Sequence, residues 1–437
     1  MNSRHDQSEN TTTEASDLSA ARNGQGRSVI RLILVVFAIV VVGLYTNTIG
    51  TIAVVAALVA MIMIHELGHF ITAKMSGMKV TEYFLGFGPK LWSIRKGETE
   101  YGVKAIPAGG YVRIIGMNSL ETVDPQDEPR TYRQGKFYQR VIVTSAGSVM
   151  HFVMAFLLLW SLFSFIGIPN NSKVEIAAVS KFDNSVAPAA KAGLQPGDII
   201  DSANGKKITS SSQLAQIISH SVGKEVTLVV TRNGTTATKH VVPANANNVT
   251  VSGQPIVPKS SKPTGIIGVE LVSPIQKMNP ISAIGASATN MWSYSLKTIG
   301  ALVSHFSPHG ISSYVHQLQN PSTQINSPGA SSRFESPVGI VRLASQAVRS
   351  GIGSVISLLF SINIFVGIFN LIPLLPLDGG HIAIAIYERI RSTKQKRYQV
   401  DIMKLMPVTY FVLTVIILLG VTALYLDITH PLSNPFG

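Results

Sequence analysis

The sequence predicts a polytopic α-helical membrane protein of about five transmembrane helices, with a β-segment in one loop and one β-rich domain outside the cytoplasm. Three observations predict this fold class. The 437 residues are 46 % hydrophobic and only 14 % charged, against about 25 % charged in an ordinary soluble domain. Five apolar runs have about 17 to 28 residues each, which is long enough to cross a bilayer. Basic residues gather in two of the loops between these runs, as they do on the cytoplasmic side of membrane proteins.

The composition excludes several kinds of site and of partner. The chain has no cysteine, so disulfide frameworks, iron–sulfur clusters and thiolate zinc sites are excluded, and any metal must be held by histidine and carboxylate side chains. The formal net charge is +13. A basic balance also occurs in nucleic-acid-binding proteins, but the concentration of Lys and Arg in loops fits membrane topology better. We therefore expect the lipid bilayer as a partner, and no nucleic acid.

The N-terminal region is predicted to be a polar tail followed by an extra helix. Residues 1–28 are rich in Ser, Thr, Asn, Gln and Gly, which predicts a disordered cytoplasmic tail because too little apolar surface is present to offset the entropy of ordering. The apolar residues 29–45 predict a transmembrane helix. A signal peptide is the alternative, since basic residues precede this run. The lack of a small-x-small cleavage motif before the next run favours the uncleaved helix.

Four further transmembrane helices are predicted at residues 49–73, 141–168, 352–380 and 408–425. Eleven Lys and Arg residues lie between the second and third apolar runs, and six lie between the fourth and fifth. Basic loops of this kind remain in the cytoplasm. The N-terminus and both loops are therefore expected inside the cell, and the long segment between the third and fourth runs is expected outside.

Three segments between the membrane helices have patterns of their own. Residues 80–115 combine short alternating runs with closely spaced glycines, which predicts a β-segment in the first basic loop. Residues 173–273 alternate β-like runs with Asn-Gly turn signals at Asn204 and Asn233, as in a small β-rich domain. Residues 274–350 are predicted to form amphipathic helices on the membrane side, around a loop rich in Pro, Ser and Asn.

The strongest local signal is the run His65-Glu66-Leu67-Gly68-His69. Its i,i+4 spacing puts both imidazoles on one helix face, where two nitrogens can take adjacent corners of a zinc tetrahedron, and Glu66 can reach a metal-bound water. Such groups are costly deep in an apolar helix unless they face a polar interior. The run therefore predicts a catalytic metal site. The alternative is structural, with both histidines hydrogen-bonded to neighbouring helices and Glu66 a structural ion.

A tetrahedral catalytic site needs a third protein ligand and keeps its fourth position for water. Asp378 is the best candidate near a membrane helix. Pro373 and Pro376 interrupt the helix before it, and a broken helix at membrane depth is tolerated only against protein or a wet cavity. The alternative is that Asp378 only caps the helix beginning near His381.

Together these motifs resemble the site-2 protease family of intramembrane zinc metalloproteases, and most of all its bacterial branch that cleaves anti-sigma factors. The resemblance covers about residues 49–425. It rests on the His-Glu-x-x-His run and on Asn-x-x-Pro followed by Leu-Asp-Gly at 370–379. It also rests on matches to the family's membrane-associated β-segment at 83–89 and 105–112, to the turn of its PDZ domains at 189–200, and to a segment before its penultimate core helix at 336–340.

The resemblance implies a zinc ion held by His65, His69 and Asp378, with Glu66 as the general base. It implies a membrane-associated β-segment and an extracytoplasmic PDZ-like domain at residues 173–273. The implied substrates are single-pass transmembrane proteins in regulated proteolysis, and an upstream site-1 protease acts on the same substrates. The implied location is the cytoplasmic membrane of a bacterium, as a multi-pass protein with its N-terminus in the cytoplasm.

One position departs from the family pattern. The family usually has Ala-Gly-Pro-x-x-Asn after the first basic loop, whereas this chain has Ala-Gly-Ser-Val-Met-His at 146–151. His151 is thus a candidate for contact with the substrate or the developing oxyanion, with packing as the alternative. Asn370 is a second candidate for such a contact. The extra N-terminal helix resembles nothing in the family core and is expected to act only as an anchor.

Two other classes of function fit parts of the sequence. A membrane scaffold or chaperone would bind protein termini through the β-rich domain and keep a silent metal site, but the intact Glu66 opposes this. A transporter would also place His, Glu and Asp within the membrane. The duplicated halves that are common in transporters are not visible in this sequence.

Overall fold

The computed structural model of the chain describes residue 30 and residues 32–117, 121–183, 185–255, 262–320, 334–393 and 396–431. The predicted polar tail at 1–28 lies outside these residues. The chain divides into two compact units. The helical unit comprises residues 1–162 and 281–437, and the β unit comprises Phe163–Pro280.

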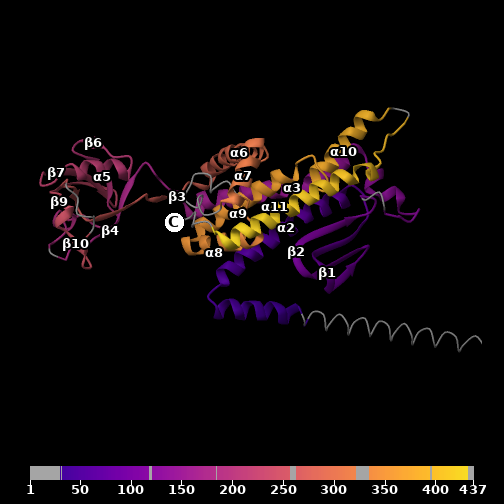
Figure 1. Cartoon of the computed structure of the whole chain (residues 1–437), viewed down its shortest axis with the longest axis horizontal. Coiled ribbons are helices and arrows are strands. Elements are labelled where there is room, and N and C mark those ends of the chain that lie inside the picture. Colours follow the sequence, from indigo (N-terminus) through magenta and orange to yellow (C-terminus); the bar gives the residue numbers. More distant parts are fainter. Residues whose placement is uncertain are drawn as a thin grey trace, which may run out of the picture. The chain divides into compact units, whose positions relative to one another are not determined.

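Within the described residues, four helices are long and apolar enough to cross a membrane (Figure 1). They are α2 (Ile49–Met75), α3 (Phe137–Ser161, followed by a π-helical turn, Leu162–Ile166), α9 (Ile352–Asn370) and α11 (Met406–Thr429). Each overlaps one of the predicted spans, so the structure confirms apolar helices at four of the five predicted positions.

The fifth predicted span, at residues 29–45, is described only in part. Leu32–Tyr45 forms a shorter apolar helix, which covers about 20 Å at 1.5 Å per residue, against about 30 Å for the hydrocarbon core of a bilayer. Its apolar side chains are exposed, for example Phe37 at 64 % and Leu44 at 62 %. A membrane-spanning role for this helix therefore stays a prediction.

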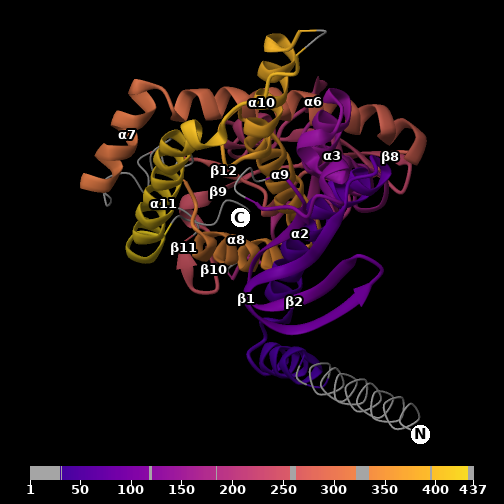
Figure 2. The same ribbon diagram turned by 90° about the vertical axis from the view of Figure 1, so that its right-hand side faces the viewer.

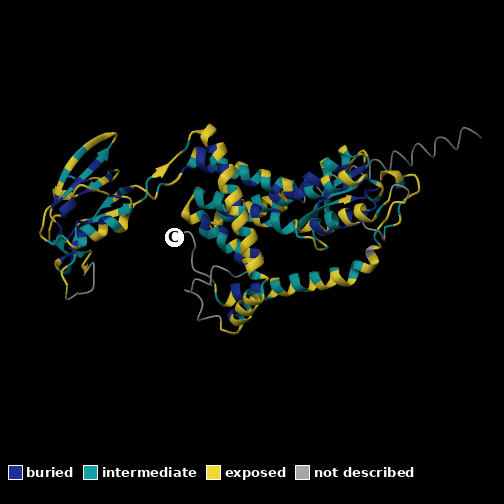
Figure 3. Cartoon of the chain, turned by 90° about the horizontal axis from the view of Figure 1, so that it is seen from above, coloured by how far each residue is buried: buried dark blue, intermediate teal, exposed yellow. Residues whose placement is uncertain are grey.

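The C-terminal part of α2 buries mainly small and polar residues. His65, Gly68 and His69 are buried there, and their spacing of three and four residues places them on one side of the helix. A Cβ at Gly68 would lie 2.7 Å from the carbonyl oxygen of Ala146, so glycine allows α3 to approach closely, as is typical of membrane helices. Figure 3 shows exposed residues along the outer sides of the helices.

The predicted β-segment forms one long antiparallel hairpin of β1 (Val80–Lys96) and β2 (Thr99–Ile114). The turn lies at Gly97, where φ is +63°. Gly86 and Gly88 have φ of +84° and coincide with shifts in strand register. Glycine adopts this backbone conformation without steric cost, so the strand bends at these positions and continues rather than ending.

The hairpin lies beside α2 (Figure 2). The ring of Phe70 on α2 contacts that of Tyr83 on β1, with 5.5 Å between centroids. At the hairpin turn, Arg130 and Lys74 form ion pairs with Glu98 and lower the pKa of that carboxyl to about 2. These contacts fix the hairpin against the half of α2 that carries the two histidines.

The described part of the helical unit contains four further helices. They are α6 (Pro280–His305), α7 (Pro308–Gln319), α8 (Pro337–Ser350) and α10 (Asp378–Arg391), with 3₁₀ turns at Glu128–Arg130, Tyr132–Gln134 and Ile402–Leu405. The helices predicted in 274–350 are thus α6, α7 and α8, while residues 321–333 lie outside the described part. Ala344 and Ala347 of α8 are fully buried against α2 and α9.

The β unit is built on one antiparallel sheet with strand order β13-β4-β5-β7-β8, and β6 pairs with β5. These strands are β4 (Val174–Val179), β5 (Ile199–Ala203), β6 (Lys206–Lys207), β7 (Val226–Arg232), β8 (Thr235–Val241) and β13 (Val269–Val272). Two-residue strands and two helices complete the unit: β3 (Ile168–Pro169), β9 (Ala244–Asn245), β10 (Thr250–Val251), β11 (Gln254–Pro255), β12 (Gly265–Ile266), β14 (Ile275–Gln276), α4 (Pro188–Lys191) and α5 (Ser211–Ser219).

Both predicted Asn-Gly turns are confirmed. Asn204-Gly205 joins β5 to β6, and Asn233-Gly234 joins β7 to β8, with positive φ at all four residues. Two positive φ values in a row define the tight hairpin turn that matches strand twist, and Asn-Gly is the pair that adopts them most easily. The sheet and α5 enclose one apolar core, which includes Leu214 and Leu228.

Candidate metal centre

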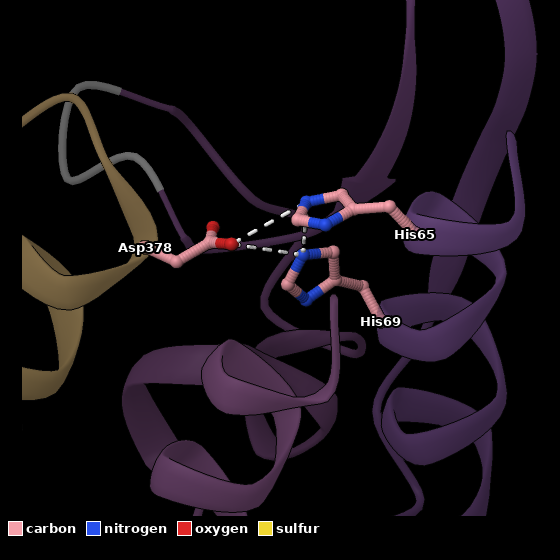
Figure 4. Close-up of side chains that lie close together, drawn as sticks. All are labelled: His65, His69 and Asp378. Atoms are coloured by element: carbon pink, nitrogen blue, oxygen red, sulfur yellow. Dashed lines mark hydrogen bonds and ion pairs between the residues drawn. The ribbon is translucent and has the colours of Figure 1, made fainter. Parts of the chain in front are cut away.

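Three side chains that could bind a metal meet inside the helical unit. His65 and His69 come from adjacent turns of α2, and Asp378 is the first residue of α10 (Figure 4). Nε2 of His65 lies 3.2 Å from Nε2 of His69. Oδ2 of Asp378 lies 3.4 Å from Nε2 of His65 and 3.3 Å from Nε2 of His69. The three atoms therefore form a nearly equilateral triangle.

This triangle fits a zinc ion. Zinc bonds of about 2.0 to 2.1 Å in tetrahedral geometry put neighbouring ligand atoms about 3.3 to 3.4 Å apart. Two imidazole nitrogens and one carboxylate oxygen form a common ligand set for catalytic zinc. Oδ2 of Asp378 is buried and makes no hydrogen bond, which is costly for a carboxylate oxygen unless a cation compensates it. In the described part of the chain, this is the one group of His, Asp and Glu side chains with such geometry.

Helix α3 holds both imidazoles in place. Nδ1 of His69 lies 2.7 Å from the carbonyl oxygen of Val143, and this contact makes Nδ1 the protonated nitrogen and leaves the lone pair of Nε2 toward the centre. Gly147 lies directly against the two rings, since a Cβ at this position would overlap both His65 and His69. The sequence reasoning did not identify the roles of Val143 and Gly147.

Glu66 lies on the side of α2 that faces the hairpin. The backbone N–H of Val112 on β2 lies near its carboxylate. A Cβ at Gly110 would lie 3.2 Å from Cγ of Glu66, so glycine allows the strand to come close to this side chain. Glu66 is thus held between the histidine-bearing helix and the strand.

Helix α10 begins at Asp378 itself, three residues before the predicted start near His381. Leu377 is the N-cap residue of α10, and no side chain caps this helix. The predicted tight backbone path is confirmed at Gly379 and Gly380: a Cβ at Gly379 would overlap the carbonyl oxygens at the end of α9, and one at Gly380 would lie 2.6 Å from the backbone nitrogen of Leu375. These two glycines let the chain fold back so that the first residue of α10 reaches α2.

His151 lies next to the triangle, and Asn370 does not join it. The ring centroid of His151 is 5.0 Å from that of His65, and its Nδ1 lies 2.8 Å from Oδ1 of Asn363 on α9. Asn363 also donates to the carbonyl oxygen of Leu359 at 2.9 Å. Asn370 ends α9, and no hydrogen bond links it to the triangle within the described residues. The sequence reasoning missed Asn363, although an Asn in the middle of an apolar helix is a signal for a buried partner.

Comparison with known proteins identifies the family. The sequence model of peptidase family M50 matches residues 53–415. The chain belongs to this family. The zinc metalloprotease Rip1 of Mycobacterium tuberculosis is 30 % identical over 413 residues, which cover 88 % of this chain and 98 % of Rip1. Rip1 of Mycolicibacterium smegmatis is 31 % identical over 416 residues, with the same coverage.

As a member of peptidase family M50, the site-2 protease family, the chain is an intramembrane zinc metalloprotease and its substrates are membrane proteins. The predicted family, enzyme class and cofactor are confirmed. The scaffold and transporter alternatives are thereby excluded. The prediction of an integral membrane protein agrees with the four apolar helices in the described part of this M50 peptidase.

Proposed function

We propose that this peptidase hydrolyses peptide bonds inside the transmembrane segments of single-pass membrane proteins, and that trimmed anti-sigma factors are among them. His65, His69 and Asp378 hold the zinc ion. Glu66 is the general base. The observation that carries the proposal is the triangle of donor atoms with sides of 3.2 to 3.4 Å, set among apolar helices.

The chemistry follows from the placement of these side chains. Bound zinc makes water more acidic and polarises the scissile carbonyl group. Glu66 takes a proton from the attacking water and returns it to the leaving amine. Gly110 allows β2 to come close to Glu66, and the contact of His69 with the Val143 carbonyl keeps Nε2 of that ring unprotonated.

His151 is proposed as a positioning residue rather than an oxyanion donor. Asn363 donates through its amide nitrogen to the carbonyl oxygen of Leu359, so its oxygen is the atom that faces Nδ1 of His151 and accepts a hydrogen bond from the N–H there. In the neutral ring, Nε2 then carries no proton and cannot donate to an oxyanion. Asn370, at the end of α9, remains a proposed substrate contact, and Asn370→Ala should raise KM without changing zinc content. An unchanged KM would contradict that contact.

The decisive experiment measures zinc content and cleavage of a single-pass substrate with the purified chain. The wild type should hold about one zinc ion. Glu66→Gln removes the base and no ligand, so zinc should stay while hydrolysis falls by about 10² to 10⁴. His65→Ala should lose zinc, and Asp378→Asn should bind it more weakly. Undiminished zinc in His65→Ala would contradict the ligand set, and full activity of Glu66→Gln would contradict the base.

The β1–β2 hairpin is proposed to hold the substrate. A helical substrate hides its carbonyl groups and must unwind locally, and an added strand could pair with an edge of the hairpin. In the described residues the hairpin pairs with no third strand. A photo-crosslinking residue at Ile106, which is 55 % exposed, should capture substrate, whereas one at Phe411, 70 % exposed on α11, should not. Equal capture at both positions would contradict this role.

The β unit is proposed to be a PDZ-like domain outside the cytoplasm that controls access to the site. As a filter, it excludes substrates whose outer part has not yet been trimmed by the upstream protease; as a receptor, it binds peptide termini. We favour the filter. Deletion of residues 173–273 should then release cleavage of untrimmed substrate. A folded, zinc-loaded deletion variant that ignores untrimmed substrate would rule the filter out.

The proposed topology places the N-terminus and both basic loops in the cytoplasm of a bacterium, because basic residues gather there. The chain has no native cysteine, so single cysteines report location directly. Ser212→Cys in the β unit should react with an impermeant thiol reagent on intact cells, and Thr393→Cys only after lysis. The opposite labelling pattern would contradict the proposed topology and show the reverse orientation.

A further inference from the structure

A cavity of about 310 Å³ lies between the start of α3 and the end of α10, away from the metal centre. Its lining includes four cationic side chains and two aromatic ones: Lys136, Arg140, Arg389, Arg397, Phe137 and Tyr398. Glu388 is the one acidic residue of this lining. The balance of charge around the cavity is therefore strongly positive.

The acidic residue is already paired. Glu388 and Arg140 form an ion pair with side chains only 9 % and 8 % exposed. Arg397 donates to the carbonyl oxygens of residues 133, 134 and 135, at 2.6, 3.2 and 2.9 Å, and to no carboxylate. Within the described residues, Lys136 Nζ and the Arg389 guanidinium have no hydrogen bond or ion pair with the protein. Three cations at this cavity thus have no balancing acid.

The cavity also lies at the level where α3 becomes a membrane-crossing helix. Phe137 and Tyr138, the first two residues of the α3 span, are 39 % and 53 % exposed. Aromatic side chains at the end of a membrane helix favour the head-group layer. Basic pockets between membrane helices at this level are suited to anionic head groups.

We propose that this cavity binds the phosphate group of an anionic lipid. Lys136 and Arg389 contact the phosphate, and Arg397, fixed by three carbonyl groups, contributes its charge. The location at the bilayer surface favours a lipid over free phosphate, because the lipid brings its phosphate to this depth. The bound head group bridges the start of α3, which holds both imidazoles, and the end of α10, whose first residue is Asp378.

The test uses the purified full-length chain in an uncharged detergent. Phosphatidylglycerol, phosphatidylcholine and inorganic phosphate are titrated separately, and bound lipid is counted by native mass spectrometry while the melting temperature is followed. We expect one tightly bound phosphatidylglycerol that raises the melting temperature, and neither effect with phosphatidylcholine or phosphate alone.

The variant K136Q/R389Q should bind phosphatidylglycerol about ten- to thirtyfold more weakly. The matched control K297Q/R349Q removes the same charge from exposed cations that do not line this cavity and should bind like the wild type. Because the four side chains are exposed and make no hydrogen bond or ion pair within the described residues, the lipid-free melting temperatures should agree. Equal binding of both lipids, equal loss in both double variants, or stabilisation by inorganic phosphate but not by lipid would overturn the proposal. None of these outcomes depends on hydrolysis.

Discussion

The two units of this chain are organised in opposite ways. The β unit encloses an apolar core, in which Ile176 and Leu228 are completely buried. The helical unit exposes large apolar side chains, such as Phe411 at 70 %, and buries His151 and Asn363. When hydrocarbon surrounds a helix, burial of apolar surface no longer drives packing. Hydrophobicity therefore identifies the fold in the β unit, whereas buried polarity identifies the functional site in the helical unit.

The largest effect should come from the core of the β unit. Leu228→Ala leaves a cavity at a position with 0 % exposure and should lower the free energy of unfolding of this unit by about 2 to 5 kcal/mol. Leu418→Ala on α11, where the leucine is 61 % exposed, should change stability by less than about 1 kcal/mol. Hydrogen exchange, followed separately in the two units, measures both changes in stability. Equal effects would contradict the contrast between the units.

The second effect should come from the close packing of the helical unit. Gly147→Ala adds a methyl group against both imidazoles and should lower hydrolysis about a hundredfold, since a displacement of about 1 Å at a catalytic site costs this much. Zinc content should fall as well. Gly420→Ala on α11 is the control, because nothing lies within 4 Å of its Cβ position. Full activity of Gly147→Ala would show that the rings have room to move.

A smaller effect should come from the buried polar pair. Asn363→Leu removes the hydrogen bond to His151 and should cost about 0.6 to 2 kcal/mol, the range for hydrogen bonds between membrane helices. Hydrolysis should drop while zinc content is kept, because no ligand is changed. Thr414→Val on α11 is the control, since this hydroxyl bonds only its own helix. Loss of zinc in Asn363→Leu would instead show that Asn363 helps to hold the zinc ligands in position.

The smallest effect concerns pH and is confined to the β unit. The Arg232 guanidinium and the backbone N–H of Gln195 hold the pKa of Asp198 below its usual value. A lowered pKa adds stability above the unfolded value near 4 that is lost as pH falls through the folded pKa. The melting temperature of this unit should fall on acidification from about pH 5 to pH 3, by roughly a few degrees. The variant Asp198→Asn should melt at a lower temperature at pH 7, and its melting temperature should change less on acidification. If its melting temperature falls with pH as much as that of the wild type, other groups cause the effect.

The sequence located the residues of the proposed zinc site better than it located their surroundings. His65 and His69 are recognisable because helix geometry alone brings them together, and Asp378 because prolines and glycines flank it. The partners of Gly147 and Asn363 were not predictable, since they depend on which faces of α3 and α9 meet α2, although an Asn within an apolar helix does signal a buried partner. The hairpin was predicted, but not its bends at Gly86 and Gly88, because strand register is a property of the folded pair.

The order of the residues in the chain has a consequence for synthesis. Asp378 follows His69 by about 310 residues, which take roughly 15 to 60 seconds to translate at 5 to 20 residues per second. During this time α2 is complete while its carboxylate partner does not yet exist. The nascent chain therefore passes through most of its membrane insertion, alongside other newly inserted helices, without a complete cluster. With Asp378 as the proposed third ligand, the zinc site can be completed only late in the synthesis of the chain.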